Sequence, residues 1–148
     1  RDVQPFFHHE LFHLYHSRSF ADCPAVWCNL WSEGLATYVA HRLNPEASDH
    51  ELLLTLPEPI REPVERNRRE AVCAVRERLD SRANDDNRAL FSFNRLNERL
   101  PPRFGYYVGY LVAAEAGRTR SLQQLAAMPG SEVRPLLETT LRSLAECG

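Results

Sequence analysis

The residues best suited to chemistry lie near the start of the chain, in the segment His9-Glu10-x-x-His13. Each residue of a helix advances by about 100° around the axis, so these two histidines would lie one turn apart on one face. Two imidazoles in this arrangement can bind one Zn²⁺ ion. Glu10 would lie beside them, where its carboxylate can take a proton from water at the metal. The segment therefore predicts a metal site with an adjacent general base.

A catalytic zinc site usually has three protein ligands and one open position, so a third ligand must come from another element. Glu33 is the best candidate, because it lies in an apolar stretch where an unpaired carboxylate would be costly. The loop 17–28 is long enough for a second helix to return antiparallel to the first. Gly34 would leave space close to the ligand. We therefore expect His9, His13 and Glu33 to bind the metal.

Hydrophobic spacing predicts the two helices that must position these side chains. The first helix would follow a cap at Asp2, have Pro5 in its first turn and end near His16. The second would run from about Asn29 to Leu43. The residues expected to face the core are Phe7, Leu11 and Leu14 in the first helix, and Leu30, Leu35, Val39 and Leu43 in the second.

The rest of the chain is also predicted to be mostly helical. A long helix is expected from Ile60 to Arg82, with a solvated face rich in Arg and Glu and a narrow apolar seam. An irregular segment, 84–103, would precede an apolar helix from Phe104 to Ala116, and Ser121 and Ser131 would cap two closing helices. No long segment alternates with the period of two that strands require. The expected fold class is therefore mainly α, a helical bundle.

Length and composition limit the classes of protein to consider. The chain has 148 residues, which suits a single domain over residues 1–148, and a net charge of −2, which gives no general attraction to nucleic acid. No apolar run reaches the ~20 residues that span a bilayer. Four cysteines permit disulfides, and Cys23 and Cys28 are the pair best placed to form one. Because the chain starts at Arg1 without a methionine, we expect it to be a piece of a longer protein. Its oligomeric state and its compartment, extracytoplasmic or not, stay open.

The segment His9-Glu10-x-x-His13 followed by Glu33 resembles the gluzincin metallopeptidases, and the nineteen intervening residues equal the thermolysin-type spacing. The stretches 33–38 (Glu-Gly-Leu-Ala-Thr-Tyr) and 105–110 (Gly-Tyr-Tyr-Val-Gly-Tyr) resemble more closely a bacterial family of predicted zinc-dependent proteases. The resemblance implies zinc as the cofactor, Glu10 as the general base in the hydrolysis of peptide bonds, and a peptide or protein as the substrate.

The resemblance also implies roles for two tyrosines and reveals two departures. Tyr106 and Tyr110 are candidates to donate a hydrogen bond to the developing oxyanion, and ordinary aromatic packing is the alternative. In thermolysin-like enzymes an Asp orients the first zinc-binding His, whereas here that position holds Thr37. The β-sheet of the family, whose edge strand pairs with the substrate, would lie before Arg1. We therefore expect the chain to correspond to the helical active-site part of such an enzyme.

Two other interpretations of these residues stay open. In the first, the fold and the metal persist in a binding module that does not cut peptides. In the second, the chain is a helical interaction domain that uses the Arg-rich segment 60–82 on a partner, and the histidines are incidental. Metal content separates the second interpretation from the others, because a bound zinc ion would contradict it.

Overall fold

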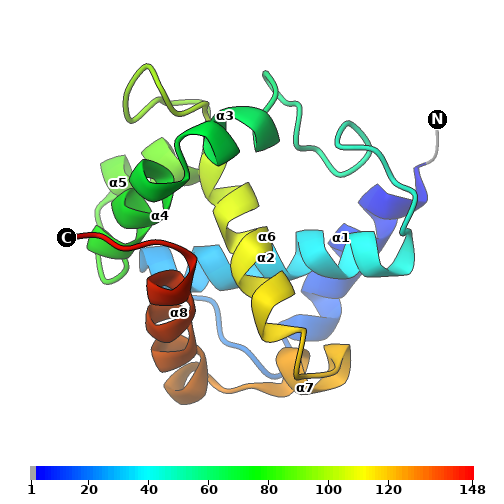
Figure 1. The fold of residues 1–148 in the computed structure, drawn as a ribbon. Helices are drawn as coiled ribbons and strands as arrows, with labels where there is room; N and C mark the ends of the chain where they lie inside the picture. Colours follow the sequence, from blue (N-terminus) through cyan, green and yellow to red (C-terminus); the bar gives the residue numbers. More distant parts are fainter. Residues whose placement is uncertain (1–2) are drawn as a thin grey trace.

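The computed structural model describes residues 3–148, so the predicted cap at Asp2 lies outside the described residues. Within this range the chain forms eight helices and no strand, which confirms the mainly α prediction (Figure 1). The predicted C-terminal ends of the first two helices agree with the structure. The helices are α1 (Gln4–His16), α2 (Val26–Leu43), α3 (Arg61–Arg66), α4 (Arg68–Glu77), α5 (Asn84–Phe91), α6 (Phe104–Ala116), α7 (Leu122–Ala127) and α8 (Gly130–Leu144).

Helix α2 is the centre of the fold. It crosses the molecule and packs against both α1 and α6 (Figure 1). Leu30, Trp31 and Leu35 on this helix are fully buried. Burial of a large apolar side chain contributes roughly 1.5–3 kcal/mol, so these residues anchor α2 firmly in the core. The position of Glu33 is therefore fixed by the packing of α2, and α1 places the two histidines next to this helix.

The crossing of α2 and α6 depends on two glycines. A Cβ atom at Gly34 would lie 2.3 Å from the carbonyl carbon of Gly109, and a Cβ atom at Gly109 would lie 2.6 Å from the carbonyl oxygen of Leu30. No side chain fits at either position unless a backbone moves. The space expected beside the ligand at Gly34 is therefore occupied by the backbone of α6.

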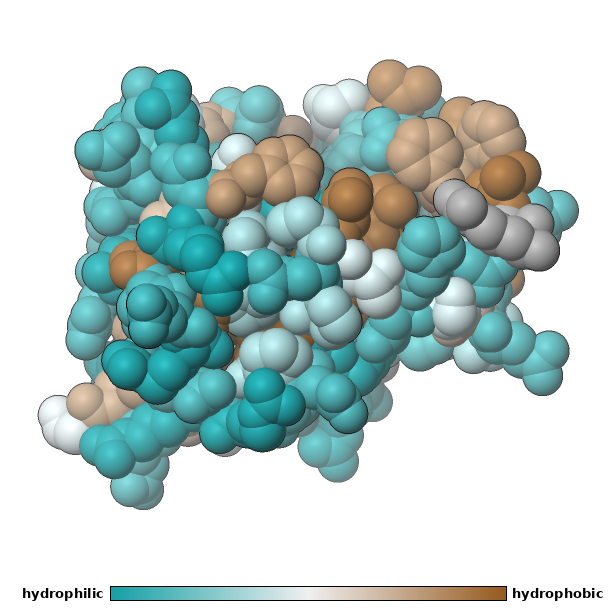
Figure 2. Space-filling model, turned by 90° about the horizontal axis from the view of Figure 1, so that it is seen from above, coloured by the Kyte–Doolittle hydropathy of each residue, from teal (hydrophilic) through white to brown (hydrophobic). Residues whose placement is uncertain are grey.

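Helix α1 presents an apolar face to solvent. Phe7, Leu11 and Leu14 are 55%, 58% and 69% exposed, so the prediction that they face the core is wrong, and Leu43 at the end of α2 is exposed as well. In Figure 2, apolar surface gathers on the right, the side on which α1 lies in Figure 1. Hydrophobic spacing alone does not say which face of a helix is covered. The buried residues of α1 are instead Pro5, His9, Phe12 and His16.

Three other predictions about helices also need correction. The segment from Ile60 to Arg82 is not one helix: α3 ends at Arg66 and α4 runs from Arg68 to Glu77. Between them, the side chain of Asn67 donates to the carbonyl oxygen of Pro63 at 2.9 Å. The segment predicted to be irregular contains α5, whose first turn has two acidic residues that interact favourably with the helix dipole. Ser131 lies inside α8 and does not cap it, whereas Ser121 caps α7 as predicted.

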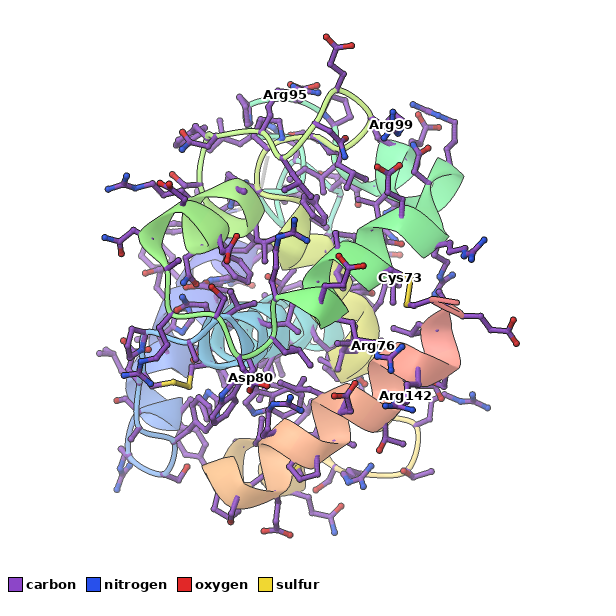
Figure 3. All side chains as sticks on the ribbon, turned by 90° about the vertical axis from the view of Figure 1, so that its left-hand side faces the viewer. Cys73, Arg76, Asp80, Arg95, Arg99 and Arg142 are labelled. Atoms are coloured by element: carbon purple, nitrogen blue, oxygen red, sulfur yellow. A yellow bond between two sulfur atoms is a disulfide. The ribbon has the colours of Figure 1, made fainter. Side chains whose placement is uncertain are left out.

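Arg76 on α4 and Arg99 in the loop before α6 are both paired with acids. Arg76 contacts Glu138 of α8 at 2.9 Å, and Arg99 contacts Glu70 at 2.7 Å (Figure 3). Such pairing weakens any positive field over this face.

No helix in the described part of the chain combines the length and the apolar character needed to cross a bilayer. The apolar seam beneath the arginines is buried, as predicted, and consists of Val64, Ala71, Val72, Val75 and Leu79.

All four cysteines form disulfides. Cys23–Cys28 joins the loop after α1 to the first turn of α2, and it is the pair that the sequence favours. Cys73–Cys147 ties the C-terminal segment to α4, a bridge that the sequence does not single out (Figure 3). The first bridge therefore restrains the connection between the two helices that carry the candidate ligands.

Candidate metal centre

Helices α1 and α2 bring together the three side chains that the sequence predicts as metal ligands. The Nε2 atoms of His9 and His13 lie 3.1 Å apart. Oε1 of Glu33 lies 3.2 Å from Nε2 of His9 and 3.1 Å from Nε2 of His13. The side chain of His9 is buried, and those of His13 and Glu33 are each 27% exposed. The three atoms therefore meet at a point that is enclosed by the core on one side and reaches solvent on the other.

The separation of these atoms fits a tetrahedral divalent cation. Ligand atoms that lie roughly 2.0–2.1 Å from a tetrahedral Zn²⁺ are about 3.3–3.4 Å from one another. The three observed separations, 3.1–3.2 Å, are close to that value. When the two imidazole nitrogens are unprotonated, they are electron-pair donors like the carboxylate oxygen, and a shared cation would explain why the three atoms converge. The residues present therefore fit a zinc ion held by His9, His13 and Glu33.

The two histidines keep Glu33 ionised. Burial raises the pKa of Glu33, but the hydrogen bonds and charges of His13 and His9 outweigh burial and lower that pKa to about 2. Burial lowers the pKa of His13, yet its hydrogen bond to Glu33 and the charges of Glu33 and Glu10 raise it overall. This point of the structure therefore attracts positive charge, which a proton or a metal ion can supply.

Glu10 lies at the edge of the three ligands. Its Oε1 is 3.9 Å from Nε2 of His9, and its side chain is 54% exposed. One ligand-type atom from each of His9, Glu10 and His13 lies within 4.8 Å of the others. Glu33 lies closer to His9 than Glu10 does, so of the two carboxylates Glu33 fits the position of a third ligand better. The carboxylate of Glu10 is accessible to water.

No protein-family model, curated protein or solved structure matches the chain. The function of this centre therefore has to be inferred from the side chains that form it. The tyrosines, the arginine and the other polar residues next to these three side chains are described in turn below.

The two candidate tyrosines have different surroundings. Burial raises the pKa of the Tyr106 phenol, and the nearby negative charges of Glu33 and Glu10 raise it further. The hydroxyl of Tyr110 instead lies 2.7 Å from Nδ1 of His41. Of the two tyrosines, Tyr106 is therefore the one whose pKa is raised by the carboxylates of Glu33 and Glu10.

Arg103 is a residue of this region that the sequence analysis missed. Its backbone is left-handed, with φ 63°, although its side chain disfavours that conformation. Its Nη1 donates to the carbonyl oxygens of Leu53 and Leu56, both at 2.8 Å, and its guanidinium carbon lies 4.2 Å from the centre of the Tyr106 ring. Arg103 therefore holds Tyr106 against the loop that follows α2. No local pattern marks it, because its carbonyl partners are 50 and 47 residues away.

The side chain of Thr37 does not reach across to a histidine. Its hydroxyl donates to the carbonyl oxygen of Glu33, one turn earlier in α2, at 2.9 Å. His8 lies outside the ligand set, with Nδ1 2.8 Å from the side-chain nitrogen of Asn44. Neither residue therefore adds a ligand to the centre.

His16 is buried one turn beyond His13 in α1. Its Nε2 has no hydrogen-bond partner among the described residues, and its ring stacks on Phe20 with ring centres 5.0 Å apart. Burial and the nearby charge of His13 lower the pKa of His16 to about 4. The ring is therefore neutral at neutral pH.

Acid is expected to destabilise the metal-free protein through His16. Its pKa is about 4 in the folded state against 6.5 for an ordinary histidine, so between these values the unfolded chain binds the proton more readily. The free energy of unfolding should therefore fall on the order of 2–3 kcal/mol as the pH decreases from 6.5 to 4. Urea unfolding at several pH values measures this change. The His16→Phe variant, which cannot titrate there, should lose this part of the pH dependence, and an unchanged dependence would contradict the assignment.

Proposed function

We propose that the chain is the helical active-site part of a gluzincin-like zinc metallopeptidase, which hydrolyses peptide bonds. One observation carries the proposal: His9, His13 and Glu33 converge with ligand atoms within 3.2 Å of one another, and Glu10 lies beside them. A structural zinc site usually has four protein ligands, whereas a catalytic site keeps one position open. Three ligands with an exposed carboxylate at their edge favour catalysis.

Each residue of the centre has a defined chemical task in this proposal. A zinc ion held by the three ligands supplies Lewis acidity, which lowers the pKa of water and polarises a carbonyl group. Glu10 accepts a proton from the attacking water and returns it to the leaving amine. Tyr106 donates a hydrogen bond from its phenol to the oxyanion that forms on the carbonyl oxygen. The raised pKa of Tyr106 keeps this phenol protonated at neutral pH, as a donor must be.

Replacing Glu33 by Ala is expected to lower the affinity for zinc by about 100-fold or more, because two histidines alone remain as ligands. Elemental analysis should find about one zinc ion per wild-type chain and much less in Glu33→Ala. Peptide hydrolysis should disappear with the metal. Glu132→Gln, which removes the same charge from the exposed start of α8, should keep both. Wild-type protein that binds no zinc would contradict the proposal.

A non-catalytic metal-binding module is the second candidate. One observation favours it: the hydroxyl of Thr37 is bonded to the backbone of its own helix, so it does not support His9 as the Asp of thermolysin-like enzymes supports the first histidine. Wild-type protein that contains zinc but cleaves neither casein nor a mixed peptide library would favour this candidate.

The disulfides support a proposal about the compartment. Cys23–Cys28 and Cys73–Cys147 together use every cysteine of the chain. Disulfides persist in oxidising compartments and are rare in the cytosol of mesophiles. We therefore propose an extracytoplasmic location, and titration of thiols in protein isolated from its native source should find none.

A further inference from the structure

A cavity of 270 Å³ adjoins the metal centre between the C-terminal end of α1 and the start of α2. His13 and Glu33, two of the proposed ligands, form part of its wall. Asp22, Asn29 and His16 also line it, and they have no task in the mechanism proposed above. A group that enters this cavity would lie next to the bond that the metal centre attacks.

Two side chains of the cavity present hydrogen-bond acceptors. Asp22 is exposed, and its carboxylate forms no hydrogen bond or ion pair with another described residue. Asn29 presents its carbonyl oxygen, because its Nδ2 donates to Oδ1 of Asn87 at 2.7 Å. Asn87 is oriented in turn by the donation of its Nδ2 to the carbonyl oxygens of Pro24 and Ala83. The direction of the Asn29 amide is therefore determined by this network.

The rings of His16 and Phe20 form an aromatic part of the cavity wall. The side chain of His16 is buried, at 2% exposure, and its Nε2 has no hydrogen-bond partner among the described residues. Phe20 stacks on this ring and also lines the cavity, so an alkyl chain can pack against it while its polar end meets the acceptors.

We propose that this cavity binds a cationic group of the peptide substrate, an ammonium or a guanidinium, next to the bond that is cleaved. The inference rests on the proposed peptidase function. The carboxylate of Asp22 and the amide oxygen of Asn29 can accept hydrogen bonds from such a group, and no arginine is among the described residues that line the cavity. The volume lies below the ~300 Å³ at which pockets for drug-sized ligands begin, which suits a single side chain or chain end.

Two pairs of peptides test the proposal by rates of hydrolysis. The first pair is blocked at both ends and differs only in arginine against citrulline, its neutral isostere. The second pair lacks charged side chains and differs only in a free or an acetylated amino terminus. Wild-type protein is expected to cleave the cationic member of one pair about tenfold faster, since a hydrogen bond to a charged group contributes that much or more. The pair that shows the preference identifies the source of the cation, a side chain or an amino terminus.

Two variants, one in the cavity and one as a control, test whether the preference depends on Asp22. Asp22→Asn should remove the preference for the cationic peptide and keep the rate on the neutral one, whereas Glu132→Gln on α8 should retain the preference. Equal rates within both pairs would overturn the proposal. A preference that survives Asp22→Asn would overturn it as well.

Binding to the metal-free protein separates this proposal from the proposed function. Calorimetry with the cationic peptides should show that the preferred one binds about tenfold more weakly to Asp22→Asn than to wild-type protein. Weaker binding to Asp22→Asn than to wild-type protein, without any hydrolysis by either, would contradict the peptidase proposal and support the cavity proposal. Hydrolysis without a preference for a cation would contradict the cavity proposal alone, and the absence of both binding and hydrolysis would contradict both.

Discussion

Replacing Glu10 by Gln should lower the rate of peptide hydrolysis by about 10³-fold while the protein retains its zinc. The amide keeps the size of the side chain but is not basic, so it cannot take a proton from water. Glu10 also lies outside the three atoms that converge within 3.2 Å of one another, so zinc binding should be unaffected. Single-turnover hydrolysis and zinc analysis of the same sample measure the two effects.

The matched control for this experiment is Glu132→Gln. It makes the same chemical change at an exposed position in the first turn of α8, a helix that carries no proposed ligand. Its hydrolysis rate and its zinc content should equal those of the wild type. Loss of zinc from Glu10→Gln would mean that Glu10 is a ligand, and full activity would exclude Glu10 as the general base.

Replacing Gly34 by Ala is expected to lower the free energy of unfolding by about 3 kcal/mol or more. The new Cβ would lie 2.3 Å from the carbonyl carbon of Gly109 and 2.5 Å from its oxygen, so α2 and α6 would have to separate. Backbone atoms occupy this space, so no change of rotamer can relieve the clash. Urea unfolding followed by circular dichroism measures the loss. Zinc affinity should fall with it, because Glu33 directly precedes Gly34.

Gly130→Ala serves as the control for the Gly34 experiment. A Cβ atom at Gly130 would lie 3.3 Å from its nearest neighbour, a ring atom of Trp27, and α8 begins at this residue. Ala favours the helix by up to about 1 kcal/mol relative to Gly, which offsets the tight contact. The stability of this variant should be within about 0.5 kcal/mol of the wild type. Similar small effects at both glycines would show that the two helices do not cross as closely as described.

Features that depend on neighbouring residues could be predicted from the sequence. Helix α6 runs from Phe104 to Ala116 as expected, because a largely apolar stretch follows a Pro-Pro pair and ends at Gly117. The meeting of Glu33 with the two histidines could also be anticipated. The spacing of four residues places His9 and His13 on one face, and a short loop limits where the next helix can lie.

Features that depend on distant segments could not be predicted. The spacing of Phe7, Leu11 and Leu14 indicates an apolar face of α1, but it does not reveal whether another part of the chain covers that face. The role of Gly34 becomes evident only when α2 and α6 are known to cross. Arg103 makes its contacts across about a third of the chain, where sequence spacing carries no information.

The apolar outer face of α1 also determines how the purified protein should be handled. Sulfate and similar salts strengthen contacts between apolar surfaces, so they are expected to promote aggregation through Phe7, Leu11 and Leu14. Cooling weakens the same contacts. Dilute, cold buffers without sulfate therefore suit assays of this protein, because the helix with this exposed apolar face also carries His9 and His13.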